Sequence, residues 1–162
     1  MKMKIGFGFD AHRFKTGRQF ILGGVRIPFD VGLEGHSDAD VLVHAFMDGL
    51  LGAMGKGDIG QHFPDDDKQY RNISSMILLE KVMDLVEDNG YFVSNADITV
   101  LCQFPKLAPF VDTMEKNLAG ACKISPKMIN IKATTTEMMG FTGRREGIAT
   151  YAAVLLMQKE LA

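Results

Sequence analysis

Hydrophobic residues alternate with glycine near the start of the chain, over residues 4–10. Ile5, Phe7 and Phe9 are separated by single glycines. This period of two predicts a β-strand that is packed on one face. Because glycine has no side chain beyond hydrogen, the intervening positions allow another part of the chain to approach the backbone closely.

The rest of the chain alternates between helical and strand-like periodicity. Apolar residues recur every three or four positions over 38–54 and 74–88, which predicts two amphipathic helices. A turn at 105–109 leads into a predicted third helix with Phe110, Met114 and Leu118 on its apolar stripe. Further strands are predicted at 20–27, where Gly23 and Gly24 break the run, and at 98–102, 128–133 and 148–157. Loops are predicted at 30–35, 55–67 and 134–147, which are polar or rich in glycine.

The order of these elements, β-β-α-α-β-α-β-β, predicts a single α+β domain over 1–162. We expect an α/β two-layer arrangement in which helices pack on one face of a mixed β-sheet. A chain of 162 residues is long enough to bury its own core. Segment 148–157 is apolar on both faces and is therefore the predicted central strand.

Composition narrows the class of protein. With 46% hydrophobic and 23% charged residues, the chain is typical of a soluble globular protein. It has no apolar run near the ~20 residues of a membrane helix, and its N-terminus does not resemble a secretory signal, so a cytoplasmic location is expected. The net charge of −2, without a basic stripe, argues against nucleic acid as a partner. Cys102 and Cys122 lack Cys-x-x-Cys spacing and are interpreted as two buried thiols.

Histidine is concentrated in the first part of the chain, where all four copies occur at or before His62. Asp10 and His12 are two residues apart at the end of a predicted strand, so their side chains project to the same side. His44, on a predicted helix, could supply a third ligand. Three protein ligands leave one tetrahedral position open, which a catalytic zinc ion requires. A hydrogen-bonded surface pair is the alternative explanation of the Asp-x-His motif.

Other local motifs match known chemistry less well. His36-Ser37-Asp38 contains the residue types of a serine hydrolase, but sequence neighbours cannot form the required relay, and a helix cap explains Ser37 better. The chain has neither a complete dinucleotide-binding fingerprint nor a P-loop.

Residues 132–137 place three threonines and Glu137 at the end of a predicted strand, and Arg144 follows. Hydroxyls and Arg bind phosphate, and a carboxylate can hold a divalent ion between phosphates. A solvated turn is the alternative. Taken with the Asp10, His12 and His44 set, the pattern favours metal-assisted phosphate chemistry.

Eight short motifs, in order along nearly the whole chain, resemble the 2-C-methyl-D-erythritol 2,4-cyclodiphosphate synthase family. They are Gly8-Phe-Asp-Ala-His12, Gly23-Gly-Val-Arg-Ile-Pro28, Gly35-His-Ser-Asp-Ala-Asp40, Gly57-Asp-Ile-Gly60, Phe63-Pro-Asp-Asp-Asp67, Pro105-Lys106, Lys132-Ala-Thr-Thr-Thr-Glu137 and Gly140-Phe-Thr-Gly-Arg144.

The resemblance implies a phosphorus–oxygen lyase of non-mevalonate isoprenoid precursor biosynthesis. Its substrate would be 4-diphosphocytidyl-2-C-methyl-D-erythritol 2-phosphate, whose 2-phosphate attacks the β-phosphorus to give the cyclic diphosphate and CMP. The family pattern implies a zinc ion held by Asp10, His12 and His44. It also implies a second divalent cation, Mg²⁺ or Mn²⁺, at Glu137, and transition-state stabilisation by His36 and Thr135. Positioning and charge neutralisation would dominate such a phosphoryl transfer.

The resemblance assigns substrate contacts to the two parts of the substrate. Asp58 and the 63–67 loop would hold the erythritol part, and 102–108 with Thr134 would hold the cytidine. The full implied set is Asp10, His12, His36, Ser37, Asp58, Ile59, Gly60, Phe63, Pro64, Asp65, Asp66, Asp67, Cys102, Gln103, Phe104, Pro105, Lys106, Leu107, Ala108, Thr134, Thr135, Thr136, Glu137, Phe141 and Arg144.

The resemblance also implies a homotrimer with active sites between neighbouring subunits. Phe141 and Arg144 would face a cavity on the threefold axis that can hold an isoprenoid diphosphate. Two positions depart from the family pattern, since Asp66 replaces a common Thr and Phe104 replaces a common small residue. Two alternatives stay open at this point, a zinc-dependent phosphohydrolase that uses the same site and a protein that only binds isoprenoid diphosphates.

Overall fold

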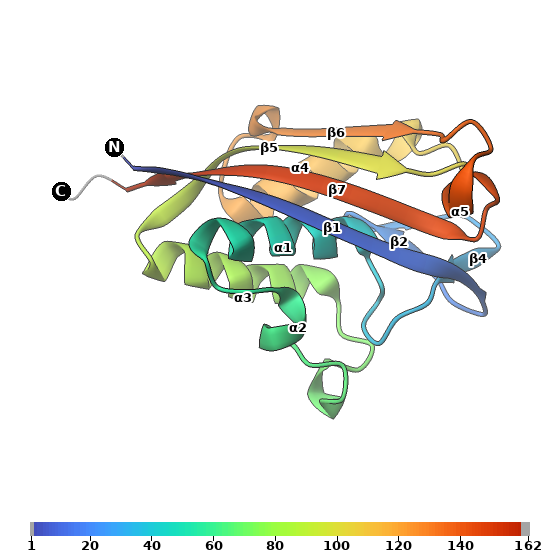
Figure 1. Cartoon of the computed structure of the whole chain (residues 1–162), viewed down its shortest axis with the longest axis horizontal. Helices are drawn as coiled ribbons and strands as arrows, with labels where there is room; N and C mark the ends of the chain where they lie inside the picture. The colour runs from blue at the N-terminus through green and yellow to red at the C-terminus, as the bar shows by residue number, and fades with distance from the viewer. Residues whose placement is uncertain (1, 160–162) are drawn as a thin grey trace.

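A five-stranded mixed sheet forms one layer of the computed structural model, which describes residues 2–159 (Figure 1). The strand order is β4-β1-β7-β5-β6. The strands are β1 (Met3–Thr16), β4 (Val31–Leu33), β5 (Tyr91–Leu101), β6 (Ile129–Thr134) and β7 (Gly147–Gln158). β1 and β5 pair antiparallel with β7 on its two sides, and β6 runs parallel to β5. The predicted mixed sheet with β7 at its centre is confirmed.

Three long helices form the second layer, on one face of the sheet (Figure 1). They are α1 (Val41–Met54), α3 (Ser75–Asp88) and α4 (Val111–Cys122). Short helical turns are α2 (Ile59–His62), α5 (Gly140–Gly143) and the 3₁₀ turns Lys68–Tyr70, Ala108–Phe110 and Pro126–Met128. The three predicted helices and the α+β arrangement are confirmed.

The start of α1 is fixed by a buried carboxylate. Asp40 is the N-cap residue and accepts a hydrogen bond from the backbone N–H of Val43 at 3.1 Å. The same carboxylate accepts the N–H groups of Gly23 and Gly24 at 2.9 and 2.7 Å. Because Asp40 is fully buried, these bonds replace the water that the carboxylate loses. They also hold a β-hairpin against the beginning of α1.

That hairpin corrects one prediction. Residues 20–27 form two short strands, β2 (Phe20–Leu22) and β3 (Val25–Ile27), which pair with each other in a separate sheet. The turn between them is made by two glycines with φ of 56° and 69°, a conformation that other residues rarely adopt. The two glycines, which interrupt the predicted strand in the sequence, therefore reverse the chain and divide the strand in two.

Four further segments also differ from the prediction. The predicted loop 30–35 contains β4, which pairs antiparallel with the end of β1, and the loops 55–67 and 134–147 contain α2 and α5. The strand predicted at 98–102 begins at Tyr91. Its first half carries polar residues on the exposed face and a bulge between Val93 and Asn95, so its alternation is interrupted in the sequence.

Strand β1 presents two different rows of side chains. Gly6 and Gly8 are buried and face α1, where a Cβ added to Gly8 would lie 1.9 Å from the carbonyl oxygen of Ala45. The opposite row is exposed, with 78% of Ile5 and 65% of Phe7 accessible. The predicted close approach at the glycines is confirmed. The face that packs in the described chain, however, is the glycine row rather than the aromatic row.

Two predictions from composition can also be compared with the structure. Cys102 and Cys122 are buried free thiols, as interpreted from their spacing, and burial raises the pKa of each to about 12. Among the described residues, none of the helices has the length and apolar character needed to cross a membrane.

Candidate functional site

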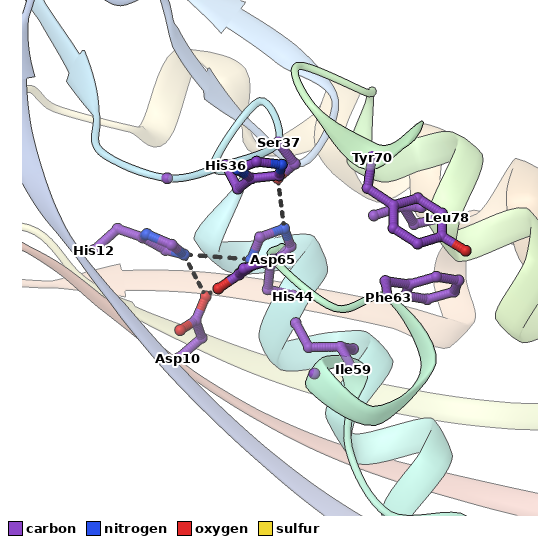
Figure 2. A pocket seen from close by; sticks show the side chains of 12 residues that line it. Asp10, His12, His36, Ser37, His44, Ile59, Phe63, Asp65, Tyr70 and Leu78 are labelled. Atoms are coloured by element: carbon purple, nitrogen blue, oxygen red, sulfur yellow. Dashed lines mark hydrogen bonds and ion pairs between the residues drawn. The ribbon is translucent and has the colours of Figure 1, made fainter. Parts of the chain in front are cut away.

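The glycine row of β1 continues into a cluster of polar side chains. Asp10 and His12 follow Gly6 and Gly8 on the same side of the strand, as their spacing predicted, and α1 places His44 opposite them (Figure 2). The Asp10 Oδ2 atom lies 2.8 Å from His12 Nε2 and 3.2 Å from His44 Nδ1. The two imidazole nitrogens are 3.3 Å apart. Close packing at the glycines therefore brings three potential ligands from two elements together.

Both histidines are also held on the side away from this cluster. His12 Nδ1 lies 2.6 Å from the backbone oxygen of Glu34, to which it can donate a hydrogen bond. His44 Nε2 lies 3.2 Å from Ser37 Oγ and 3.0 Å from Ser75 Oγ. A histidine that donates from one nitrogen presents a lone pair at the other, as a metal ligand must.

The donor set fits a zinc ion. One ligand atom from each of Asp10, His12 and His44 can be chosen so that all three lie within 4.8 Å of one another. Two imidazole nitrogens and one carboxylate oxygen suit zinc, and three protein ligands leave a position free for a substrate oxygen. This arrangement is consistent with a divalent metal.

The electrostatics of the cluster couple Asp10 to its two neighbours. Burial by itself would raise the pKa of Asp10, but hydrogen bonds from His12 and His44 hold it well below its ordinary value. For His12, burial would lower the pKa, and the hydrogen bond and charge of Asp10 raise it above its ordinary value. In the absence of metal, Asp10 and His12 thus stabilise each other's charged forms.

These shifts predict how the stability of the metal-free protein depends on pH. The depressed pKa of Asp10 stabilises the fold above the ordinary aspartate pKa, and this contribution is lost as the pH falls through the folded value. The raised pKa of His12 stabilises the fold below the ordinary histidine pKa, and this contribution is lost as the pH rises through the folded value. Both contributions are complete between about pH 4 and pH 6.5.

We therefore expect metal-free protein to lose part of its free energy of unfolding as the pH is raised from about 6 to about 8.5. Chemical unfolding at several pH values measures this loss. His12→Gln removes the titrating group, so a variant with the same loss as the wild-type protein would contradict the assignment to His12.

The cluster lies in the wall of a cavity of about 190 Å³. Six further predicted site residues line this cavity: His36, Ser37, Ile59, Gly60, Phe63 and Asp65. The Nε2 atom of His36 is buried and has no hydrogen-bond partner among the described residues. Since an unpaired buried polar atom is costly, this nitrogen is available to a ligand in the cavity.

A hydrogen bond with α1 and two N-cap aspartates hold residues 58–67 in place. Asp48, one turn after His44, accepts the backbone N–H of Ile59 at 2.8 Å, and burial raises its pKa. Asp58 caps α2 and Asp67 caps the following 3₁₀ turn. Asp58, Pro64, Asp66 and Asp67 do not line the cavity, so the structure brings only part of this predicted group to the cluster.

The other predicted substrate residues surround a second cleft, of about 480 Å³. It is lined by Cys102, Gln103, Phe104, Pro105, Lys106, Leu107, Ala108, Ala133, Thr134 and Thr135. Thr136 and Glu137 follow in the adjoining turn, where the Thr135 hydroxyl donates to Glu137 Oε1 at 2.9 Å. Phe141 lines a third cleft beside His12, and Arg144 pairs with Glu146. Within one chain, His36 and Thr135 therefore lie in different clefts.

Sequence reasoning missed several residues of the first cleft. Gly35, Tyr70 and Leu78 line it, and Ser75 contacts His44 from the start of α3. Gly35 directly precedes His36 in one of the family motifs, a signal that could have found it. Ser75 gave no separate signal, because Ser74-Ser75 before a helix is explained fully by capping.

The chain was compared with known protein families and with known relatives. A model described as "YgbB family" matches residues 3–157. The chain belongs to the YgbB family. The resemblance to cyclodiphosphate synthases is also confirmed, because a relative from Pelotomaculum thermopropionicum named "2-C-methyl-D-erythritol 2,4-cyclodiphosphate synthase" is 56% identical over 154 residues, 95% of each chain.

Solved structures of similar proteins share the fold of this YgbB-family chain. The bifunctional IspDF of Campylobacter jejuni is 43% identical with a TM-score of 0.94, and the match covers 98% of this chain and 43% of that one. The Plasmodium falciparum IspF, solved as a CDP complex, is 33% identical with a TM-score of 0.86, covering 98% and 97%. This YgbB-family chain thus spans less than half of the bifunctional enzyme and nearly all of the other.

Proposed function

We propose that this chain converts 4-diphosphocytidyl-2-C-methyl-D-erythritol 2-phosphate to 2-C-methyl-D-erythritol 2,4-cyclodiphosphate with release of CMP. The observation that carries the proposal is the Asp10, His12 and His44 cluster, which opens to a cavity beside the unpaired nitrogen of His36. The names of the relatives point to the same reaction.

In this reaction an oxygen of the 2-phosphate forms a bond to the β-phosphorus. The bond from that phosphorus to the oxygen shared with the α-phosphate breaks, and this oxygen leaves with CMP. Asp10, His12 and His44 would hold a zinc ion, which supplies Lewis-acid stabilisation of charge on a phosphate oxygen. The protein's main task is to bend one flexible substrate until its two phosphates meet in line.

Two residues are assigned to the charge that develops at phosphorus. His36 can donate from its unpaired Nε2 to a phosphate oxygen in the first cleft. The hydroxyl of Thr135, which lines the second cleft, can do the same once it is released from Glu137 Oε1, to which it donates in this structure. Donors placed where charge develops lower the barrier most when water is excluded.

Glu137 is the proposed ligand of a second divalent cation, Mg²⁺ or Mn²⁺. Its carboxylate is exposed and accepts a hydrogen bond from Thr135. Glu137 and Met138 both have positive φ, of 51° and 66°, so the turn is held in a conformation that places this carboxylate at the end of β6. Carboxylate and phosphate oxygens are the ligands that both cations prefer.

We assign the two parts of the substrate to the two clefts. Asp58 and the 63–67 loop would hold the erythritol part near the metal site, and 102–108 with Thr134, Thr135 and Thr136 would hold the cytidine. The Plasmodium falciparum relative was solved as a complex with CDP, which supports a cytidyl ligand for this family. Asp66 and Phe104 would change substrate affinity rather than metal binding, since neither belongs to the metal-ligand cluster.

In a homotrimer with active sites between subunits, the first cleft of one subunit would meet the second cleft of its neighbour. We define the outer apolar patch as Ile5, Phe7, Phe9 and Tyr151, on the face of β1 and β7 away from the helices. Such an exposed apolar surface is typical of subunit contacts. The separation of His36 from Thr135 into different clefts supports a site completed by a second copy. Phe141 and Arg144 would then face a threefold cavity suited to an isoprenoid diphosphate.

The test is phosphorus NMR of the protein incubated with the cytidyl diphosphate substrate and Mg²⁺, with and without a zinc chelator. We expect cyclic diphosphate and CMP, and we expect both to be absent with chelator or in His44→Ala. A linear product would instead favour a zinc-dependent phosphohydrolase. Absence of turnover by zinc-loaded protein would favour a protein that only binds isoprenoid diphosphates.

A further inference from the structure

We propose that Ser75 is a positioning residue for the metal site, which fixes the tautomer and orientation of His44 through a relay that ends at Asp38. The inference rests on the proposed metal site, and it assigns a task to two residues outside the ligand set. It comes from the hydrogen bonds around a hydroxyl that is completely buried.

The relay joins three parts of the chain. Ser75, the first residue of α3, places its Oγ atom 3.0 Å from Nε2 of His44 on α1. The same hydroxyl donates to Asp38 Oδ1, in the segment that leads into α1. The backbone N–H of Ser75 donates to the other carboxylate oxygen at 2.9 Å. Both oxygens of Asp38 therefore engage Ser75, which fixes the direction of its hydroxyl.

The direction of the relay follows from the number of protons. A serine hydroxyl has one hydrogen, and an ionised carboxylate can only accept, so Ser75 must give its hydrogen to Asp38. The Ser75 oxygen then offers only lone pairs to His44. Nε2 must therefore carry a hydrogen, which leaves Nδ1, on the side of Asp10 and His12, as the nitrogen that can bind a metal.

Ser37 does not fix this direction in the same way. Its Oγ atom lies 3.2 Å from His44 Nε2 and accepts the backbone N–H of Ala39 at 3.2 Å. No carboxylate takes its hydrogen among the hydrogen bonds of the described residues, so it can donate or accept. The ordering of His44 is therefore assigned to Ser75 and Asp38, with Ser37 as a second acceptor.

The first experiment compares zinc affinity in two serine variants, by competition with a chromophoric chelator. We expect Ser75→Ala to bind zinc about 10- to 100-fold more weakly than the wild-type protein, the range found when outer partners of metal ligands are removed. Ser74→Ala is the matched control. It removes the neighbouring N-cap hydroxyl, which accepts from the Met76 N–H, and should leave zinc affinity unchanged while weakening the start of α3.

The second experiment determines by nitrogen NMR of metal-free protein whether Nε2 of His44 carries a hydrogen. In the wild-type protein Nε2 should carry one, whether or not Nδ1 also donates to Asp10. In Asp38→Asn the amide can donate to Ser75, whose hydroxyl is then free to donate to His44. The share of His44 with a hydrogen on Nε2 should decrease, and zinc affinity should fall. A merely structural role for Asp38 would leave the hydrogen on Nε2.

Two outcomes would overturn the proposal. One is a Ser75→Ala variant with zinc affinity within about 2-fold of wild type, well below the expected range. The other is a wild-type metal-free protein in which Nε2 of His44 carries no hydrogen. Wild-type protein that binds no zinc would overturn the proposed metal site itself, and the nitrogen NMR measurement, which needs no metal, would still decide the relay.

Discussion

Changing Asp10 to asparagine should lower turnover and remove most of the bound zinc. Asp10 supplies the anionic atom of the cluster, 2.8 Å from His12 and 3.2 Å from His44. A neutral amide is a weaker zinc ligand, and it no longer balances the charge that the metal brings. We expect turnover to fall by about three orders of magnitude, because losing a ligand should exceed the 10- to 100-fold effect of losing an outer partner. Steady-state kinetics and metal analysis of purified protein measure both quantities.

Glu34→Gln is the matched control for Asp10→Asn. Glu34 contributes its backbone oxygen to His12, while its exposed carboxylate pairs with Lys15. This substitution removes the same charge a short distance from the site and leaves the ligands in place, so turnover and zinc content should stay close to wild type. An Asp10→Asn enzyme with full zinc and full activity would show that the carboxylate is not a ligand.

Adding one methyl group at Gly8 should destabilise the fold by about 3 kcal/mol, the upper part of the range for overpacked cores. In Gly8→Ala the new Cβ would lie 1.9 Å from the carbonyl oxygen of Ala45, so β1 and α1 must separate. Because β1 carries Asp10 and His12 while α1 carries His44, the same separation should weaken zinc binding. Urea unfolding and zinc competition measure the two effects.

Gly120→Ala in α4 tests whether the loss at Gly8 is specific. A Cβ at Gly120 would meet no atom within 4 Å, and alanine favours a helix over glycine by about 1 kcal/mol. We therefore expect this variant to be slightly more stable than the wild-type protein. If Gly8→Ala unfolded at the same urea concentration as wild type, the proposed contact between β1 and α1 at Gly8 would be wrong.

The sequence predicted the long elements because their periodicity is strong and local. The stripe of α1 and the two apolar faces of β7 follow directly from residue spacing. It did not reveal which row of β1 packs inward. A row of glycines has no hydrophobic signal, and its burial depends on α1 lying against it, which is a tertiary contact. The break at Gly23 and Gly24 was visible in the sequence, but the hairpin formed there was not predicted, since it is held by the distant carboxylate of Asp40.

Part of the candidate site could be predicted from local sequence patterns, and part depends on tertiary contacts. Asp10 and His12 could be paired from the strand period alone, and His44 could be placed on a helix. Their meeting required the packing of that helix on the strand. Ser75 could not be predicted as a site residue, because its contact with His44 links α1 to α3 across positions far apart in the sequence. Neither the residue type nor its neighbours distinguish it from an ordinary helix cap.

The two rows of β1 also constrain how the length of the chain can change. Inserting or deleting one residue between Gly6 and Asp10 would turn every following side chain of the strand to the other face of the sheet. Asp10 and His12 would then point away from His44, and bulky residues would meet α1. At Gly17, beyond the strand, an added Cβ would meet nothing within 4 Å. We therefore expect the turn at Gly17 to tolerate insertions and deletions that β1 does not.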